Sequence, residues 1–115
     1  MNGVDEYRKF YAICNHPPLG DHAIRVGGTV CFRTSGWEAH LQPTRGNVGI
    51  NPTMLHLDLV ITAPDPGEGI QEVITCSELD EWRANTPTIE YTEVEFHVRG
   101  SGDEPPPILS VEHVT

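Results

Sequence analysis

Two short stretches of this sequence place histidine and carboxylate side chains at alternate positions. Residues 54–62 read MLHLDLVIT, with His56 and Asp58 between apolar residues, and the stretch 90–99 holds Glu95 and His97 in the same way. On a β-strand, residues two apart share a face and lie about 6.7 Å apart. Two imidazoles and two carboxylates suit Zn, Fe or Mn. The four side chains meet if the two strands pair in one sheet with matching phase, and otherwise they form a wetted sheet face, which the alternation alone explains.

A thiol and two imidazoles also lie close together in the sequence, at Cys14, His16 and His22. Their C-x-H-x5-H spacing matches no standard zinc motif, and a fourth ligand is missing. A cysteine–histidine nucleophile pair depends on placement in space, which this spacing does not establish. We therefore expect no cofactor and no resident metal ion.

Four further residues are candidates for ligand contact: Trp37, Tyr91, Arg33 and His40. Tryptophan and tyrosine are enriched at binding surfaces, where one end of the ring is apolar and the other wet. If the fold closes as a barrel, these residues are expected to line its mouth. Core packing is the competing interpretation for the aromatic residues.

The recognised signatures of enzyme chemistry are missing from the sequence. Its glycines never form GxGxxG or GxxxxGK, so a phosphate-binding loop is not supported. No G-x-S-x-G elbow of a serine hydrolase occurs either. The catalytic residues stay unknown, and the sequence leans against an enzyme.

The charge of the chain is one-sided. The formal net charge is −10, yet residues 1–64 carry five acids and five bases, whereas residues 65–115 carry twelve acids and only Arg83 and Arg99. This excess of negative charge repels phosphate and anionic lipid, so we expect neither nucleic acid nor membrane as a partner. A basic protein is the partner that such a surface favours, or a small molecule if a pocket forms.

The cysteines and the first residues indicate a compartment. The start, MNGVDEYRK, lacks a basic segment followed by an apolar one, so no secretory signal is visible. Three cysteines, an odd and small number, suggest free thiols in a reducing environment. We expect a soluble cytoplasmic protein.

Turn residues divide the chain into short elements. Apolar residues at spacings of three and four predict a short helix over 4–14, ended by Pro17 and Pro18. Residues 78–84 predict a helical turn after Ser77. Strands are predicted at 23–34, with a bulge or bend at Gly27-Gly28, and at 37–42, 54–62, 70–76, 88–99 and 108–114.

These elements predict a single all-β domain over residues 1–115, with residues 1–20 as a possible short helix and a Pro-rich lead-in. About six strands without crossover helices favour an antiparallel β-sandwich or small β-barrel with one or two short helices. The predicted core is Val26, Val30, Phe32, Trp37, Leu41, Leu55, Leu57, Leu59, Ile61, Val73, Val94, Phe96 and Val98.

The function that these observations favour is a non-enzymatic binding or protein-interaction module. The alternative is a β-barrel that binds a small molecule, with His/Asp-based catalysis or metal binding at His56, Asp58 and His97. A third hypothesis is a structural subunit that oligomerises through edge strands, the 88–99 strand or the 108–114 strand.

Overall fold

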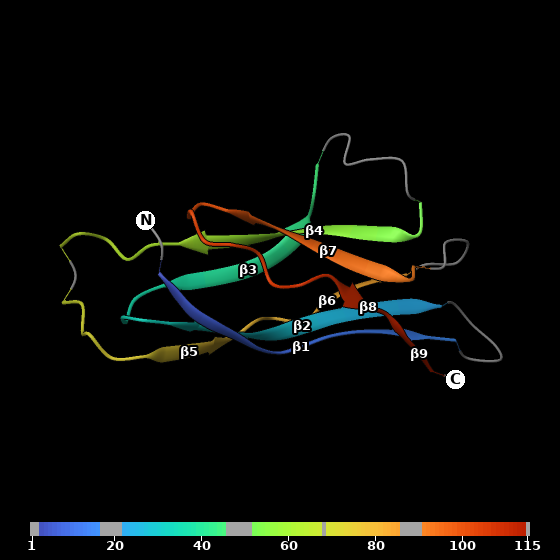
Figure 1. Ribbon diagram of the computed structural model, residues 1–115, viewed down its shortest axis with the longest axis horizontal. Helices are drawn as coiled ribbons and strands as arrows, with labels where there is room; N and C mark the ends of the chain where they lie inside the picture. The colour runs from blue at the N-terminus through green and yellow to red at the C-terminus, as the bar shows by residue number, and fades with distance from the viewer. Residues whose placement is uncertain (1–2, 17–21, 46–51, 68, 86–90, 115) are drawn as a thin grey trace.

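Every regular element in the described part of the chain is a β-strand (Figure 1). The computed structural model describes residues 3–16, 22–45, 52–67, 69–85 and 91–114. The strands in these residues are β1 (Val4–Asn15), β2 (Ala23–Phe32), β3 (Glu38–Pro43), β4 (Met54–Thr62), β5 (Thr75–Glu78), β6 (Trp82–Asn85), β7 (Glu93–Arg99), β8 (Leu109–Ser110) and β9 (Glu112–Val114). The all-β prediction is confirmed.

The strands form two sheets that face each other in a sandwich-like arrangement (Figure 1). One sheet has the order β5-β2-β1-β9, with β6 also pairing β2, and the other has the order β3-β4-β7-β8. The strands that the structure describes thus lie in two separate sheets and do not close into a barrel. The chain changes sheet between β8 and β9, which are joined by Val111. The N–H of Val111 donates to the Thr92 carbonyl at 2.9 Å.

Both sheets are mixed, so the prediction of a wholly antiparallel fold is wrong. β4 pairs β7 in parallel, and β1 pairs β9 in parallel. Two parallel strands need a long connection, which is usually a helix. The sequence shows no such crossover helix. Residues 63–92 supply that connection with β5 and β6, which join the opposite sheet.

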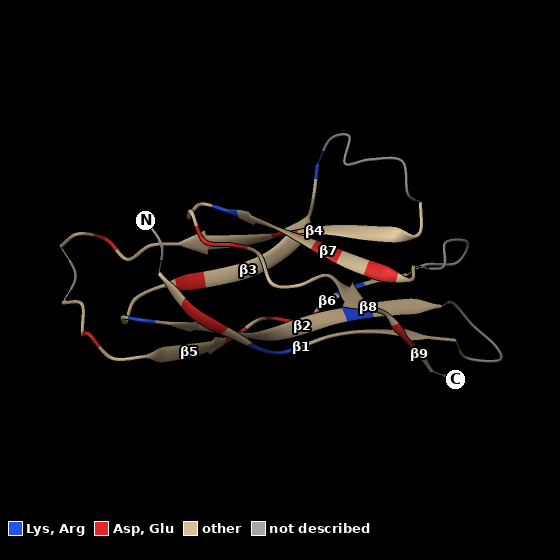
Figure 2. Ribbon diagram, viewed as in Figure 1, with Lys and Arg blue, Asp and Glu red and all other residues tan. Residues whose placement is uncertain are grey.

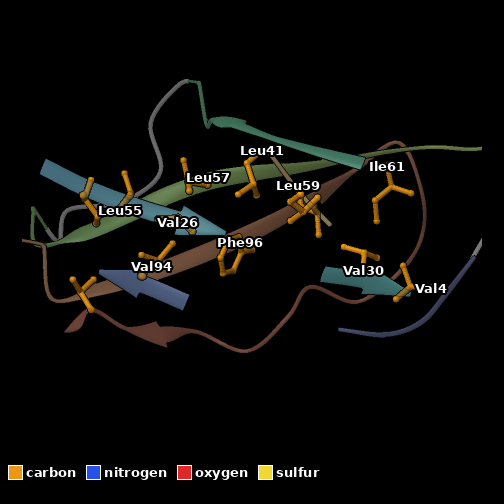
Figure 3. Packing of buried hydrophobic residues seen from close by; sticks show 14 of the residues in the cluster. Val4, Val26, Val30, Leu41, Leu55, Leu57, Leu59, Ile61, Val94 and Phe96 are labelled. Atoms are coloured by element: carbon orange, nitrogen blue, oxygen red, sulfur yellow. The ribbon is translucent and has the colours of Figure 1, made fainter. Parts of the chain in front are cut away.

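The hydrophobic core lies between the two sheets (Figure 3). Leu57 and Leu59 from β4, Phe96 from β7 and Val26 and Val30 from β2 are all at most 1% exposed. Of the thirteen predicted core residues all but Val73 and Val98 are buried, and Val98 is partly buried against the same cluster. Leu55 and Leu59 pair with Val94 and Val98 across β4 and β7, so the apolar faces of the two strands coincide.

The predicted strand at 70–76 is wrong for most of its length. β5 begins only at Thr75, and the side chains of Ile70, Val73 and Ile74 are 44%, 51% and 57% exposed. Gln71 is bound to Ser35 instead, through its carbonyl at 3.0 Å and its amide at 2.9 Å. The β-like composition of this stretch has no described neighbouring strand to pair with, and alternation without a partner does not bury Val73.

The predicted helix at 4–14 is also wrong, because two β-bulges in β1 mimic helical spacing. The pairing with β2 shifts between Val4 and Glu6 and again between Arg8 and Tyr11. Each shift adds one residue to β1 and changes the phase of its alternation. Inward positions therefore recur at spacings of three before returning to two, in the order Val4, Tyr7, Phe10, Ala12 and Cys14. The prolines predicted to end the helix lie outside the described residues.

The helical turn predicted at 78–84 is replaced by two short strands. β5 ends at Glu78, β6 begins at Trp82, and both pair antiparallel with β2. Leu79 between them is buried, as the helical interpretation also required, and its N–H donates to the Gly28 carbonyl at 2.9 Å. The first residues of the predicted 88–99 strand lie outside the described residues, and β7 begins at Glu93.

Gly27 and Gly28 mark the second bulge, as predicted, although the extra residue belongs to β1. Gly28 lies opposite both Lys9 and Phe10, and Lys9 takes a left-handed φ of 54°. A Cβ on Gly28 would lie 2.4 Å from the Phe10 ring, and one on Gly27 would lie 2.5 Å from the Tyr11 hydroxyl. The two missing side chains let adjacent aromatic rings cross β2, one on each face of the sheet.

Gly28→Ala is expected to lower the free energy of unfolding by about 1–3 kcal/mol, because the added methyl group overlaps the Phe10 ring inside the core. Urea unfolding monitored by tryptophan fluorescence measures the change. Gly67→Ala is the matched control, since nothing lies within 4 Å of its Cβ position. Equal stability of the two variants would contradict the packing described for the bulge.

The cysteine prediction is wrong for two of the three residues. Cys31 and Cys76 lie directly opposite each other on β2 and β5 and form a disulfide. The sequence could not show this pairing, because it depends on which strand lies beside β2. Cys14 takes no part in this disulfide and is fully buried. Disulfides are rare in cytosolic proteins, so this bond does not support the cytoplasmic location, which stays a prediction.

The segment after β7 crosses back over the start of β1. The Asp103 carboxylate accepts hydrogen bonds from the backbone N–H groups of Gly3 and Val4 at 3.1 and 3.2 Å. The Tyr7 hydroxyl donates to the Glu104 carbonyl at 2.6 Å. Burial, and then the negative charge of Asp103, raise the pKa of Tyr7 from 10.0 to about 12.

The raised pKa of Tyr7 predicts a loss of stability at alkaline pH. The unfolded chain ionises this phenol near pH 10, whereas the folded chain keeps its proton up to about pH 12. The stabilising contribution is therefore complete below pH 10 and is lost as the pH rises through about 12. Urea unfolding at pH values across this window is expected to show a steeper fall for the natural chain than for Tyr7→Phe. Parallel curves for the two chains would contradict the prediction.

Candidate functional site

The polar faces of β4 and β7 lie side by side on the outer surface of one sheet. The parallel register pairs His56 with Glu95 and Asp58 with His97. The four side chains were expected to meet only if the two strands pair in one sheet with matching phase, and the register of β4 with β7 has both properties. The same register buries the leucines of β4 on the opposite face, so core packing fixes where these polar side chains point.

Three of the four side chains converge. His56 Nδ1 lies 3.0 Å from His97 Nε2, and the two rings stack with centroids 5.2 Å apart. His97 Nε2 also lies 3.6 Å from Glu95 Oε1. One ligand atom from each residue falls within 4.8 Å of the others, and all three residues are half-buried. Two imidazole nitrogens and a carboxylate oxygen at this separation fit around one transition-metal ion.

The fourth residue, Asp58, is occupied elsewhere. It is 7% exposed, and its carboxylate accepts a hydrogen bond from Thr44 Oγ1 at 2.8 Å. Arg99 Nε donates to the same Oδ1 atom at 3.3 Å. Asp58 therefore connects the end of β3 to β4 and β7.

Two of the ligand-contact residues predicted from the sequence lie at a surface hollow away from His56 and His97. Trp37 and His40 line an open hollow of about 420 Å³ together with the acids Glu78 and Asp80. Trp37 itself is 9% exposed, stacks on Phe32, and donates its Nε1–H to Thr34 Oγ1 at 2.9 Å. Its main role is in the core.

The remaining two candidates do not join the group of His56, Glu95 and His97, which we call the triad. Arg33 is exposed beyond the end of β2, where its backbone N–H donates to the Gly3 carbonyl at 2.9 Å. Tyr91 precedes β7 and packs against the core cluster. The barrel mouth that would have gathered these candidates is not formed by the described strands.

An open groove of about 780 Å³ runs beside the triad. It lies between β7 and the segment that follows, and it is lined by Glu95, His97, Arg99 and residues 103–108. The triad therefore lies beside a groove that is open to solvent.

Two polar clusters lie on the other sheet, and the sequence predicts only part of one of them. One surrounds Glu81, which accepts hydrogen bonds from the Tyr11 hydroxyl at 2.7 Å and from Arg83. The Tyr11 hydrogen bond lowers the pKa of Glu81 and raises that of Tyr11. The other cluster adds His113 to Cys14 and His16. The alternation in residues 111–114, VEHV, indicates which face of the strand carries His113. Only the strand order shows that Cys14 lies beside it.

Comparisons with known proteins leave the site to be argued from its geometry. No protein-family model matches the chain, and no curated protein or solved structure shows significant similarity to it. A search of the described residues also finds no helix with the length and apolar character needed to cross a membrane.

Asp58→Ala is expected to lower the free energy of unfolding by about 1–3 kcal/mol, because Thr44 and Arg99 lose a charged acceptor. Chemical denaturation measures this loss. The variant retains His56, Glu95 and His97, so the contact between the two imidazole rings is expected to persist. A variant that keeps full stability would contradict the role described for Asp58.

Proposed function

We propose that this protein is a non-enzymatic binding module whose ligand is a divalent transition-metal ion held by His56, Glu95 and His97. The observation that carries the proposal is the convergence of three ligand atoms within 4.8 Å on one sheet face. A β-sheet places them without a loop rearrangement, since core packing on the other face fixes β4 against β7.

The donor set favours zinc among the available ions. Imidazole nitrogen suits Zn, Cu, Fe and Ni, whereas Mg and Ca prefer sites made only of oxygen ligands. Zinc also accepts the mixture of two histidines and one carboxylate found here. This proposal departs from the expectation of no metal ion, because the spacing of ligands along the chain had suggested no motif and the parallel register now supplies one.

Binding is favoured over catalysis by the openness of the site. The triad lies on a sheet face, and the groove beside it is open to solvent. Catalysis at an ion gains from a shaped site that excludes water. With three protein ligands the ion keeps one open position, which water fills in an ion-binding role.

Zinc titration followed by histidine NMR tests the proposal. Saturating Zn²⁺ is expected to perturb the ring signals of His56 and His97, and to leave those of His40 unchanged. His97→Ala and Glu95→Gln are each expected to weaken binding at this site by about tenfold or more, since each removes a ligand.

His40→Ala is the matched control, because His40 is an exposed histidine on β3 of the same sheet. It is expected to bind zinc at the triad with the affinity of the natural chain. Ring signals of His56 and His97 that do not respond to millimolar zinc would overturn the proposed function.

A second candidate function is docking of a basic protein on the acidic half of the chain. Both arginines of that half are already within salt-bridge distance of an acid, Arg83 with Glu81 and Arg99 with Asp58. Figure 2 shows acidic positions on β7 and β9. The negative charge of this half is therefore left largely uncompensated and available to a partner.

A lysine-rich peptide is a suitable probe of this second candidate. Its affinity is expected to fall as salt rises, because exposed charges are screened. Glu104→Gln is expected to bind more weakly than Glu38→Gln, which removes one exposed acid from the balanced half. Binding that is independent of salt, or equal in the two variants, would count against docking through this half.

A further inference from the structure

A second group of potential metal ligands gathers where β1 ends beside β9. Cys14, His16 and His113 each offer a ligand atom, and these atoms lie within 4.8 Å of one another. His16 Nε2 is 2.6 Å from His113 Nδ1. On its other side, His16 Nδ1 is 3.0 Å from His22 Nδ1.

Strand pairing explains why these residues meet. The parallel β1–β9 ladder pairs Cys14 with His113, and the N–H of His16 donates to the Val114 carbonyl at 2.7 Å. His16 directly follows β1 and lies two positions beyond Cys14, so the extended backbone brings the two side chains to the same side. On the other side the antiparallel β1–β2 ladder pairs Asn15 with Ala23, so His16 and His22 follow as the next opposed residues.

From this arrangement we infer a zinc site made by Cys14 Sγ, His16 Nε2 and His113 Nδ1, in which a water molecule fills the fourth position of tetrahedral zinc. A thiolate and two imidazoles form a borderline-soft set that suits zinc and does not suit magnesium or calcium. Ligand atoms around tetrahedral zinc lie about 3.3–3.6 Å apart, from Zn–N and Zn–S bonds of about 2.0 and 2.3 Å. The observed separations, 2.6 Å between the two imidazole nitrogens and at most 4.8 Å among all three atoms, bracket these values.

His22 takes a supporting position in this site. When Nε2 of His16 binds the ion, the remaining ring proton lies on Nδ1 and is donated to Nδ1 of His22, 3.0 Å away. Hydrogen bonds of this kind orient a metal-bound imidazole and raise its basicity. His22 is thus a positioning residue rather than a ligand.

The site also explains how a very short strand stays in place. β9 has three residues, all of them exposed, and its described partner strand is β1. An ion that joins His113 to Cys14 and His16 fixes β9 to the sheet from its side-chain face. Binding of zinc is therefore expected to hold β9 more firmly against β1, which is a role distinct from that of the triad on β4 and β7.

Co²⁺ substitution tests the inference on the full chain with its disulfide intact, as verified by mass. Cobalt bound to a thiolate gives a charge-transfer absorption that cobalt bound only to histidine and carboxylate does not. The natural chain is expected to show this absorption, and excess Zn²⁺ is expected to remove it. His113→Asn and His16→Gln are each expected to weaken the cobalt affinity reported by this band by about tenfold or more.

The controls separate this site from the first one. His97→Ala is expected to keep the thiolate band unchanged, whereas Cys14→Ser is expected to lose the band and retain zinc binding at His56 and His97. Because Cys14 is buried and its substitution could impair folding, the exposed His113→Asn variant carries the decisive comparison. A natural chain without the band, or a His113→Asn chain with the band at full affinity, would overturn the inference.

Discussion

The parallel pairing of β4 with β7 is the constraint on which the rest of the molecule depends. It sets Leu57 opposite Phe96 in the interior, where both are at most 1% exposed. Because side chains alternate along a strand, the same register sets His56 opposite Glu95 on the outside. A slip of one residue would bring the polar side chains into the core, so the free energy of core packing also holds the candidate ligands in place.

Both candidate ion sites form across a pair of parallel strands. The parallel pairs in the described chain are β4–β7 and β1–β9, and each brings histidines from distant parts of the sequence into contact. In parallel strands, paired residues lie on the same face and their neighbours two positions away extend the group. The two sites differ in ligand chemistry, since one contains the Glu95 carboxylate and the other the Cys14 thiol. They also lie in different sheets.

The sequence predicts the interior of this protein better than its connections. Strict alternation at 54–62 identifies β4 and its buried face, because the pattern matches a strand with one side in the core. The same reasoning fails for β1, where two bulges change the phase and imitate helical spacing. It fails again at Val73, because a strand-like composition does not show whether a partner strand is present.

The candidate sites were likewise predictable only within single strands and not between them. Sequence alone places His56 and Asp58 on one face, and Glu95 and His97 on another, but it does not show that β4 and β7 are neighbours. Nor could it show that Thr44 and Arg99 engage Asp58 and leave three ligands in place of four. His113 lies about a hundred residues from Cys14 in the chain, and only the β1–β9 pairing joins them.

X-ray diffraction at the zinc absorption edge, on crystals grown with Zn²⁺, tests the central claim most directly. The account predicts an anomalous peak about 2.0–2.2 Å from nitrogen atoms of His56 and His97 and from a carboxylate oxygen of Glu95. It also predicts Leu57 and Phe96 buried together beneath that peak. The account would be contradicted by β4 and β7 paired in another register, or by zinc-soaked crystals in which these three side chains point apart and hold no ion.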